Sequence, residues 1–233
     1  MIKIENVETF GWEAAIRGMR NPMNSWNKSD SFYCYPDGAK LPCDRCMNYN
    51  EKLDECMMNG LDEKFIIGEC DLKLMKNLVK AGSDHRKFMR MINVTLDIAA
   101  PLYWWKEFDT YKVGTVADSC STMHKIADKE FTFDDFSCEH LLPIELQCLG
   151  KVIELLNENR KIFNAGNGKD FWWQMIQMLP SSYNQKRTVQ LNYEVLRNMY
   201  HARKNHKLDE WKTYCEWIET LPYANELIVG VDA

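Results

Sequence analysis

The sequence lacks the features that assign many proteins to the membrane or to nucleic acid. No apolar run approaches the ~20 residues that a membrane-spanning helix needs, and residues 1–10 alternate apolar with charged side chains, unlike a signal peptide. An excess of basic residues is also missing, because 29 Lys and Arg face 34 Asp and Glu and give a net charge of −5. We therefore expect a cytoplasmic protein that binds neither membranes nor nucleic acid.

Familiar catalytic motifs are missing as well. The sequence contains no Walker-type phosphate loop, no GxGxxG after a strand and no HExxH zinc motif. The segment DSCSTMH places His124 four residues after Cys120. A catalytic Cys–His pair needs the base within reach of the thiol, which sequence proximity does not establish, and a buried small residue is the commoner role of such a cysteine.

Aromatic residues, in contrast, are abundant. The 233 residues include 8 Trp, 10 Tyr and 10 Phe, and 45% of all residues are hydrophobic. Aromatic side chains bury large areas, which indicates a substantial core, a pocket for a flat ligand, or both. The length fits one large domain or two small ones, and we expect a single domain over residues 1–233 with an irregular insertion at about 21–70.

The insertion contains a cluster of cysteines. Cys43 and Cys46 form a CxxC, Cys56 follows, and Cys34 and Cys70 flank the group. A CxxC turn can bring two thiolates to one metal ion, so Cys43, Cys46 and Cys56 are candidate ligands of a structural zinc. Reduced, unbound thiols are the favoured alternative, because the spacings differ from those of a standard zinc ribbon.

Periodicity predicts an α+β fold for the rest of the chain. The clearest strand is expected at residues 90–98, where Ile92, Val94, Leu96 and Ile98 alternate with other side chains. A first strand is expected at residues 1–7 and an irregular loop near Gly114. Helices are expected at residues 12–20, 71–81, 101–108, 139–158, 170–179, 185–204 and 208–220, with a turn at 164–169.

The helix expected near the C-terminus has an informative spacing. Asn192, Leu196, Met199 and Arg203 would share one of its faces. At ~1.5 Å per residue, Asn192 and Arg203 would be roughly 16 Å apart, enough to contact two parts of a nucleotide or two adjacent ligands. The alternative is an ordinary amphipathic helix whose polar ends reach the solvent, and spacing alone favours that alternative.

The segment LPSSYNQKRTVQLNYEVLRNMYHAR, residues 179–203, resembles the C-terminal block of flavin-dependent thymidylate synthases. The residues that match the spacing of that block are Pro180, Asn192, Leu196, Asn198 and Arg203. The resemblance implies that Asn192 contacts a flavin and that Arg203 contacts the pyrimidine ring of dUMP.

Residues 85–125 are similar to the family's signature more loosely. The tripeptide at residues 110–112 takes the place of an Arg-His-Arg motif, and Thr115 and Cys120 take the places of two serines. The resemblance implies a flavin-side role for His85 and Lys112. It implies contacts with the nucleotide for Thr115 and Cys120.

Departures from the signature weaken the expected grip on phosphate. Thr122 and residues 172–173 stand where arginines are expected, and Glu107 stands for a glutamine, so its charge repels phosphate. A charge-assisted hydrogen bond contributes about 1.5–3 kcal/mol, so these changes weaken nucleotide binding by several powers of ten unless other cations replace them. The candidate replacements are Lys106, Lys112, Lys125 and Arg187.

Taken as a whole, the resemblance implies a small, mostly antiparallel sheet packed with several helices. It implies FAD as cofactor, with NADPH and methylenetetrahydrofolate as reaction partners, and a homo-oligomer such as a homotetramer. Its reaction would be a reductive one-carbon transfer to dUMP or a related pyrimidine nucleotide.

Two other functions stay open. The first is a catalytically inactive descendant that binds a nucleotide or another flat ligand. Its candidate stacking residues are Tyr103, Trp104, Trp105, Phe108 and Tyr111, although we expect at least half of these in the core. The second is a structural or interaction protein in which the cysteine cluster forms a zinc-stapled docking arm.

Overall fold

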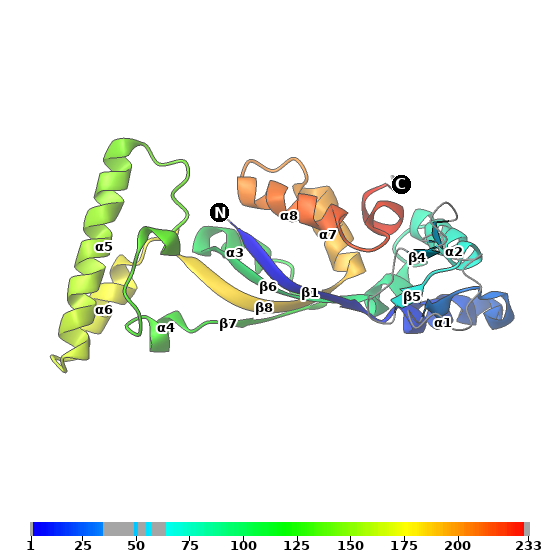
Figure 1. Cartoon of the computed structure of the whole chain (residues 1–233), viewed down its shortest axis with the longest axis horizontal. Helices are drawn as coiled ribbons and strands as arrows, with labels where there is room; N and C mark the ends of the chain where they lie inside the picture. The colour runs from blue at the N-terminus through cyan, green and yellow to red at the C-terminus, as the bar shows by residue number, and fades with distance from the viewer. Residues whose placement is uncertain (1, 35–48, 51–54, 57–63, 231–233) are drawn as a thin grey trace.

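A four-stranded antiparallel sheet forms the centre of the molecule (Figure 1). The computed structural model describes residues 2–34, 49–50, 55–56 and 64–230. Along the sheet the strands follow the order β1 (Lys3–Phe10), β6 (Asn93–Pro101), β8 (Asn184–Asn192) and β7 (Thr115–Ser119). The predicted α+β class with an antiparallel sheet is therefore confirmed.

The central strand β6 follows the alternation in its sequence. Val94, Leu96 and Ile98 are buried, whereas Thr95 and Asp97 on the opposite side are only partly covered. A strand with this alternation buries one face and leaves the other to solvent. The buried face belongs to the main hydrophobic core of the protein.

Three helices and a π-helical turn cover the buried side of the sheet (Figure 1). They are α3 (Leu102–Phe108), α7 (Tyr193–Arg203), α8 (Asp209–Glu219) and η6 (Asn225–Val229). Trp104, Trp105 and Phe108 of α3 are buried and pack against Trp211 and Tyr214 of α8 or against each other. The prediction that at least half of the aromatics of this segment are core residues is correct.

A second, smaller hydrophobic core lies where β7 ends and β8 begins, away from α7. Helix α5 (Pro143–Asn164) and helix α6 (Lys169–Met178) form a hairpin there. Two short segments complete this end, α4 (Thr122–Lys125) and η5 (Phe133–Asp135).

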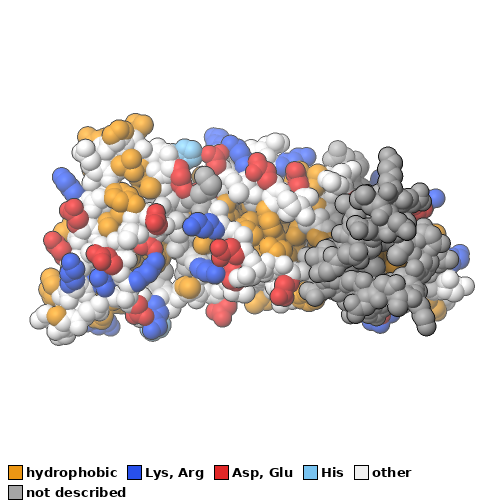
Figure 2. Space-filling view, viewed as in Figure 1, with side chains coloured by type: hydrophobic (Ala, Val, Ile, Leu, Met, Phe, Trp, Pro, Cys, Tyr) orange, Lys and Arg blue, Asp and Glu red, His pale blue; other side chains and the backbone are white. Residues whose placement is uncertain are grey.

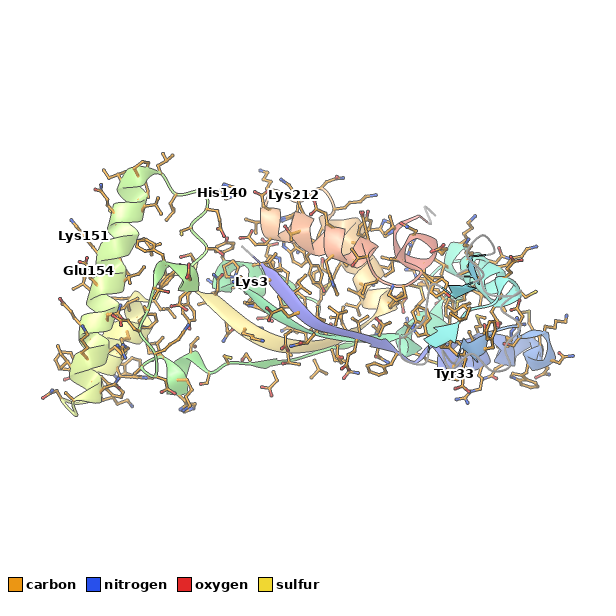
Figure 3. The ribbon with its side chains drawn as sticks, viewed as in Figure 1. Lys3, Tyr33, His140, Lys151, Glu154 and Lys212 are labelled. Atoms are coloured by element: carbon orange, nitrogen blue, oxygen red, sulfur yellow. The ribbon has the colours of Figure 1, made fainter. Side chains whose placement is uncertain are left out.

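Lys151 and Glu154 point away from the sheet on the outer face of α5 (Figure 3). Exposed hydrophobic side chains gather over the start of α5, including Leu142 and Ile144 (Figure 2).

The opposite end of the molecule is built around a buried ion pair. Arg20 Nε lies 2.6 Å from Asp71 Oδ1, with 4% and 0% of the two side chains exposed. The hydroxyls of Ser29 and Ser31 donate to the other carboxylate oxygen of Asp71, at 2.7 and 2.6 Å. Burial by itself would raise the pKa of Asp71, but the hydrogen bonds from Ser31, Ser29 and Arg20 outweigh it and hold the pKa below its ordinary value.

Several short elements surround this ion pair. They are α1 (Trp12–Arg20), η1 (Asn21–Met23), η2 (Trp26–Lys28), β2 (Phe32–Cys34), β5 (Lys64–Ile66), α2 (Glu69–Lys80) and η4 (Lys87–Met91). Two further strands, β3 (Tyr49–Asn50) and β4 (Glu55–Cys56), pair with each other. No helix among the described residues is long and apolar enough to cross a membrane.

One predicted helix is wrong over almost half of its length. The helix expected at residues 185–204 is a strand up to Asn192 and a helix only from Tyr193. In this strand Val189 and Leu191 alternate with exposed polar residues, and pairing with β6 decides the conformation. The irregular loop expected near Gly114 is present at residues 109–114, and the edge strand β7 that follows it, which pairs with β8, was not predicted.

The predicted starts of two helices, α3 and α5, also differ from those in the structure. Pro101 does not lie in the first helical turn, because its extended backbone ends β6 and caps α3. The long helix expected at residues 139–158 begins at Pro143, where the fixed φ of proline suits the first turn, and continues to Asn164. The turn predicted at 164–169 is present, with positive φ at Gly166 and Gly168.

We predict that Asp71→Asn destabilises the protein by about 3–5 kcal/mol, because it leaves the buried Arg20 charge without its partner. Urea unfolding at neutral pH measures the change. The control is Asp128→Asn, which removes the exposed ion pair with Lys125 and should cost about 0.3–0.5 kcal/mol. Equal effects of the two substitutions would contradict the role of the buried pair.

The stability of the protein is expected to depend on pH through Asp97, which lies on the face of the sheet opposite the core. Hydrogen bonds from Thr188, Asn6 and Lys186 lower the pKa of Asp97 to about 2. The unfolded value is about 3.9, so the ionised carboxylate stabilises the fold above that pH, and the contribution is lost as the pH falls towards 2. In urea unfolding, the difference in midpoint between wild type and Asp97→Asn should narrow between about pH 5 and about pH 3. A constant difference would refute this.

Candidate functional site

Asn192 lies at the junction where β8 ends and α7 begins. Its side-chain Oδ1 accepts a hydrogen bond from the backbone N–H of Val195 at 3.1 Å, so it caps the helix. Leu196 and Met199, expected on the same helix face as Asn192, are completely buried in the core. Asn192 and Arg203 therefore occupy the two ends of α7 and do not form one polar stripe.

The start of β7 lies directly against Asn192. Gly114 has a φ of +76°, and a Cβ built there would be 2.7 Å from Nδ2 of Asn192. Thr115 follows and pairs with Leu191 of β8. Its hydroxyl is buried and has no hydrogen-bond partner among the described residues. Lys112 is exposed in the loop just before this point.

The first turn of α7 carries an acid that the sequence prediction missed. Glu194 is buried. One of its carboxylate oxygens lies 3.5 Å from Arg86 Nε, and the other accepts a short hydrogen bond from Arg90. The hydrogen bond that Arg90 donates to Glu194 raises the pKa of Arg90. The sequence signal that could have identified Glu194 is its place in the first turn of a helix, where an acidic side chain is favoured. These ion pairs anchor the turn that contains the exposed His85 to the start of α7.

Arg203, at the other end of α7, is part of a mixed polar and aromatic cluster. Its Nη1 lies 2.8 Å from Glu107 Oε2, and its Nε donates to the Tyr111 hydroxyl at 3.0 Å. The guanidinium stacks over the Trp211 ring at 4.9 Å, while the indole N–H of Trp211 donates to Glu107 at 3.0 Å. His206 lies 3.3 Å from the same carboxylate oxygen.

The cluster presents a donor and an acceptor side by side. The side chains of Arg203 and Glu107 are 21% and 34% exposed, so each can still contact a ligand. Glu107 neutralises most of the charge that Arg203 would offer to a phosphate. The pair is better suited to the neutral polar edge of a planar ring. Lys106, the residue before Glu107 in α3, is exposed and forms no hydrogen bond or ion pair with either residue in the described part of the chain.

Cys120 lies at the far end of β7, away from the residues above. At ~3.4 Å per residue, β7 separates Thr115 and Cys120 by roughly 17 Å. A cavity of about 380 Å³ lies beside Cys120. Three lysines line it, and each has an acidic partner: Lys125 with Asp128, Lys129 with Asp135, and Lys186 with Asp97 and Glu5. Arg187, which like Lys125 was a candidate replacement cation, pairs with Asp109 at 2.7 Å.

The cysteine hypotheses have different outcomes. Cys43 and Cys46 lie outside the described residues, as does the side chain of Cys56, so the zinc site stays a prediction. Within the part of the chain that the structure describes, no group of His, Cys, Asp and Glu forms a metal site. The hydrogen bonds of the described residues do not join Cys120 to His124, whose backbone N–H bonds instead to Ser121.

Comparison with known proteins places this architecture in a defined structural class. No protein-family model matches the chain, and no curated protein does. Solved structures of flavin-dependent thymidylate synthases share its fold. Two of them are ThyX from Helicobacter pylori complexed with FAD and dUMP, each with a TM-score of 0.63. They are 13% and 12% identical and cover 99% of this chain and 100% and 99% of theirs.

The contact between Gly114 and Asn192 yields a prediction. Gly114→Ala adds the strain of a positive φ, about 1–3 kcal/mol, and a clash with the Asn192 amide. The control is Gly166→Ala, because Gly166 has a φ of +85° with open space around its Cβ position. Thermal unfolding should show a larger loss for Gly114→Ala than for Gly166→Ala. Equal losses would mean that the approach to Asn192 is not tight.

Proposed function

We propose that the protein binds a pyrimidine nucleotide and a flavin around α7, and that its reaction is a reductive one-carbon transfer to the pyrimidine. The observation that carries the proposal is the pairing of Arg203 with Glu107. A guanidinium donates and a carboxylate accepts, which matches the adjacent carbonyl and N–H on the edge of a uracil ring. Glu107, which the sequence suggested would weaken nucleotide binding, then becomes part of ring recognition.

The other end of α7 fits a flavin. The Asn192 amide and the close approach of Gly114 lie beside the buried hydroxyl of Thr115, which has no hydrogen-bond partner among the described residues. Lys112 and His85 would contact the same cofactor. A bound FAD would supply the hydride, with NADPH as its reductant and methylenetetrahydrofolate as the carbon donor.

Phosphate binding is proposed to involve more than one copy of the chain. Cys120 and its lysines lie the length of β7 from Thr115, so the two regions would serve different sites. The exposed Leu142 and Ile144 at the start of α5 support a homo-oligomer, with a homotetramer as the proposed form. The acidic partners of Lys125, Lys129 and Lys186 would have to release them to a phosphate.

A second candidate function rests on those same ion pairs. If the lysines stay paired, the protein is a catalytically inactive descendant that keeps ring recognition and has lost the phosphate grip. It would bind a nucleoside or another flat ligand without catalysis.

We expect the purified protein to take up FAD, with the absorbance of a bound isoalloxazine, and to release tritium from dUMP labelled at the ring carbon that receives the one-carbon unit.

Asn192→Ser keeps a helix cap but removes the amide, so flavin affinity should fall about tenfold with little loss of stability. The control is Asn205→Ser at an exposed position after α7. Flavin uptake that Asn192→Ser leaves unchanged would refute the flavin site, and nucleoside binding without tritium release would favour the inactive descendant.

The Arg203–Glu107 pair gives a separate expectation. Glu107→Gln replaces the charged acceptor of the ring N–H with a weaker neutral one and frees the Arg203 charge. It should weaken uridine binding about tenfold while strengthening binding of inorganic phosphate. Isothermal titration with each ligand measures both effects, with Glu154→Gln on the exposed outer face of α5 as control. Stronger uridine binding by Glu107→Gln would refute the proposed ring contact.

A further inference from the structure

A second cleft lies between α4 and the α5–α6 hairpin, at the end of the molecule away from α7 (Figure 1). Its volume is about 580 Å³, within the range of small-molecule sites. The lining residues are Met123, His124, Ile126, Ala127, Phe163, Lys169 and Trp172. Most of this lining is apolar.

Hydrogen bonds on both sides hold the cleft in shape. The indole N–H of Trp172 donates to the backbone carbonyl of Met123 at 2.9 Å, which links α6 to α4. The amide of Asn164 donates to the carbonyl of Ala127 at 3.0 Å, which links the end of α5 to the segment after α4. Ile126 and Ala127 are buried in the smaller core, so this wall is fixed before any ligand arrives.

The polar side chains of the lining are both nitrogen bases. The ammonium group of Lys169 lies over the Trp172 ring at 5.4 Å, and the imidazole of His124 is exposed nearby. The lining contains no Asp or Glu. Lys169 has no carboxylate within salt-bridge distance among the described residues, unlike Lys125, Lys129 and Lys186 around the neighbouring cavity. The cleft thus retains a cation available to an anion.

We propose that this cleft binds a small amphipathic carboxylate. The carboxylate would accept hydrogen bonds from Lys169 and His124, and an aliphatic or aromatic tail would lie against Ile126, Ala127 and Phe163. An apolar tail matches the lining, and a single negative charge matches the unpaired cation. The site is separate from the surfaces at the two ends of α7, and it shares only Ile126 with the cavity beside Cys120.

Titration calorimetry of the full chain with decanoate tests the proposal, below the concentration at which decanoate forms micelles. We expect one saturable site, with decanol and decylamine each binding at least about tenfold more weakly, because neither offers an anion to Lys169. Acetate, which has the charge without the tail, should show no saturable binding.

Substitutions locate the site. Lys169→Gln should weaken decanoate binding about tenfold, whereas the matched control Lys161→Gln, on the exposed side of α5, should leave it unchanged. Phe163→Ala should weaken the binding of decanoate without restoring that of decylamine. The proposal is overturned if decanoate does not saturate, if decylamine binds equally well, or if Lys161→Gln has the same effect as Lys169→Gln. Uptake of FAD is measured in each variant and should not change, so failure here is distinguishable from failure of the proposed nucleotide site.

Discussion

The pairing of β6 with β8 is the constraint on which the rest of the structure depends. The two strands are paired along their whole lengths, from Asn93 with Asn192 to Pro101 with Asn184, across about ninety residues of chain. This pairing fixes where α3 leaves the sheet and where α7 begins. Because Glu107 lies on the first of these helices and Arg203 on the second, their contact follows from the register of the two strands.

The same register explains why the sequence predicted some elements and missed others. Helix α1 has the predicted bounds, α2 and α8 lie within about two residues of them, and β6 follows its own alternation, because these segments carry their period within one stretch of sequence. In β8, Val189 and Leu191 come just before the apolar repeat of α7. The sequence pattern was therefore also compatible with a helix that begins before Tyr193 and includes them. Its partner β6 lies far away in the sequence, and only that partner settles the conformation. Edge strand β7 has an even weaker local signal, because almost all of it is exposed.

For the candidate site, the sequence supplied residue types but not their contacts. Arg203 and Glu107 were each assigned to a nucleotide, one as a favourable contact and the other as a repulsive one, and nothing in their spacing showed that they bind each other. Asn192 was assigned a ligand role on a helix face, and the structure adds a local task, the capping of α7. Ion pairs such as Glu194 with Arg86 and Arg90 escaped notice because they join segments more than a hundred residues apart.

The division of the apolar interior into two cores has a consequence for how the molecule opens. The smaller core contains α5 and α6 but none of the strand residues that anchor the main one. A unit of this kind can lose its packing while the sheet and α7 stay folded, since stability is not uniform across a structure. The cleft between α4 and the α5–α6 hairpin would then lie in the less protected part of the molecule, and the junction at Asn192 in the more protected part. A ligand in the cleft would slow the exchange of backbone amides with solvent between α4 and α6 and leave the remainder of the chain unaffected.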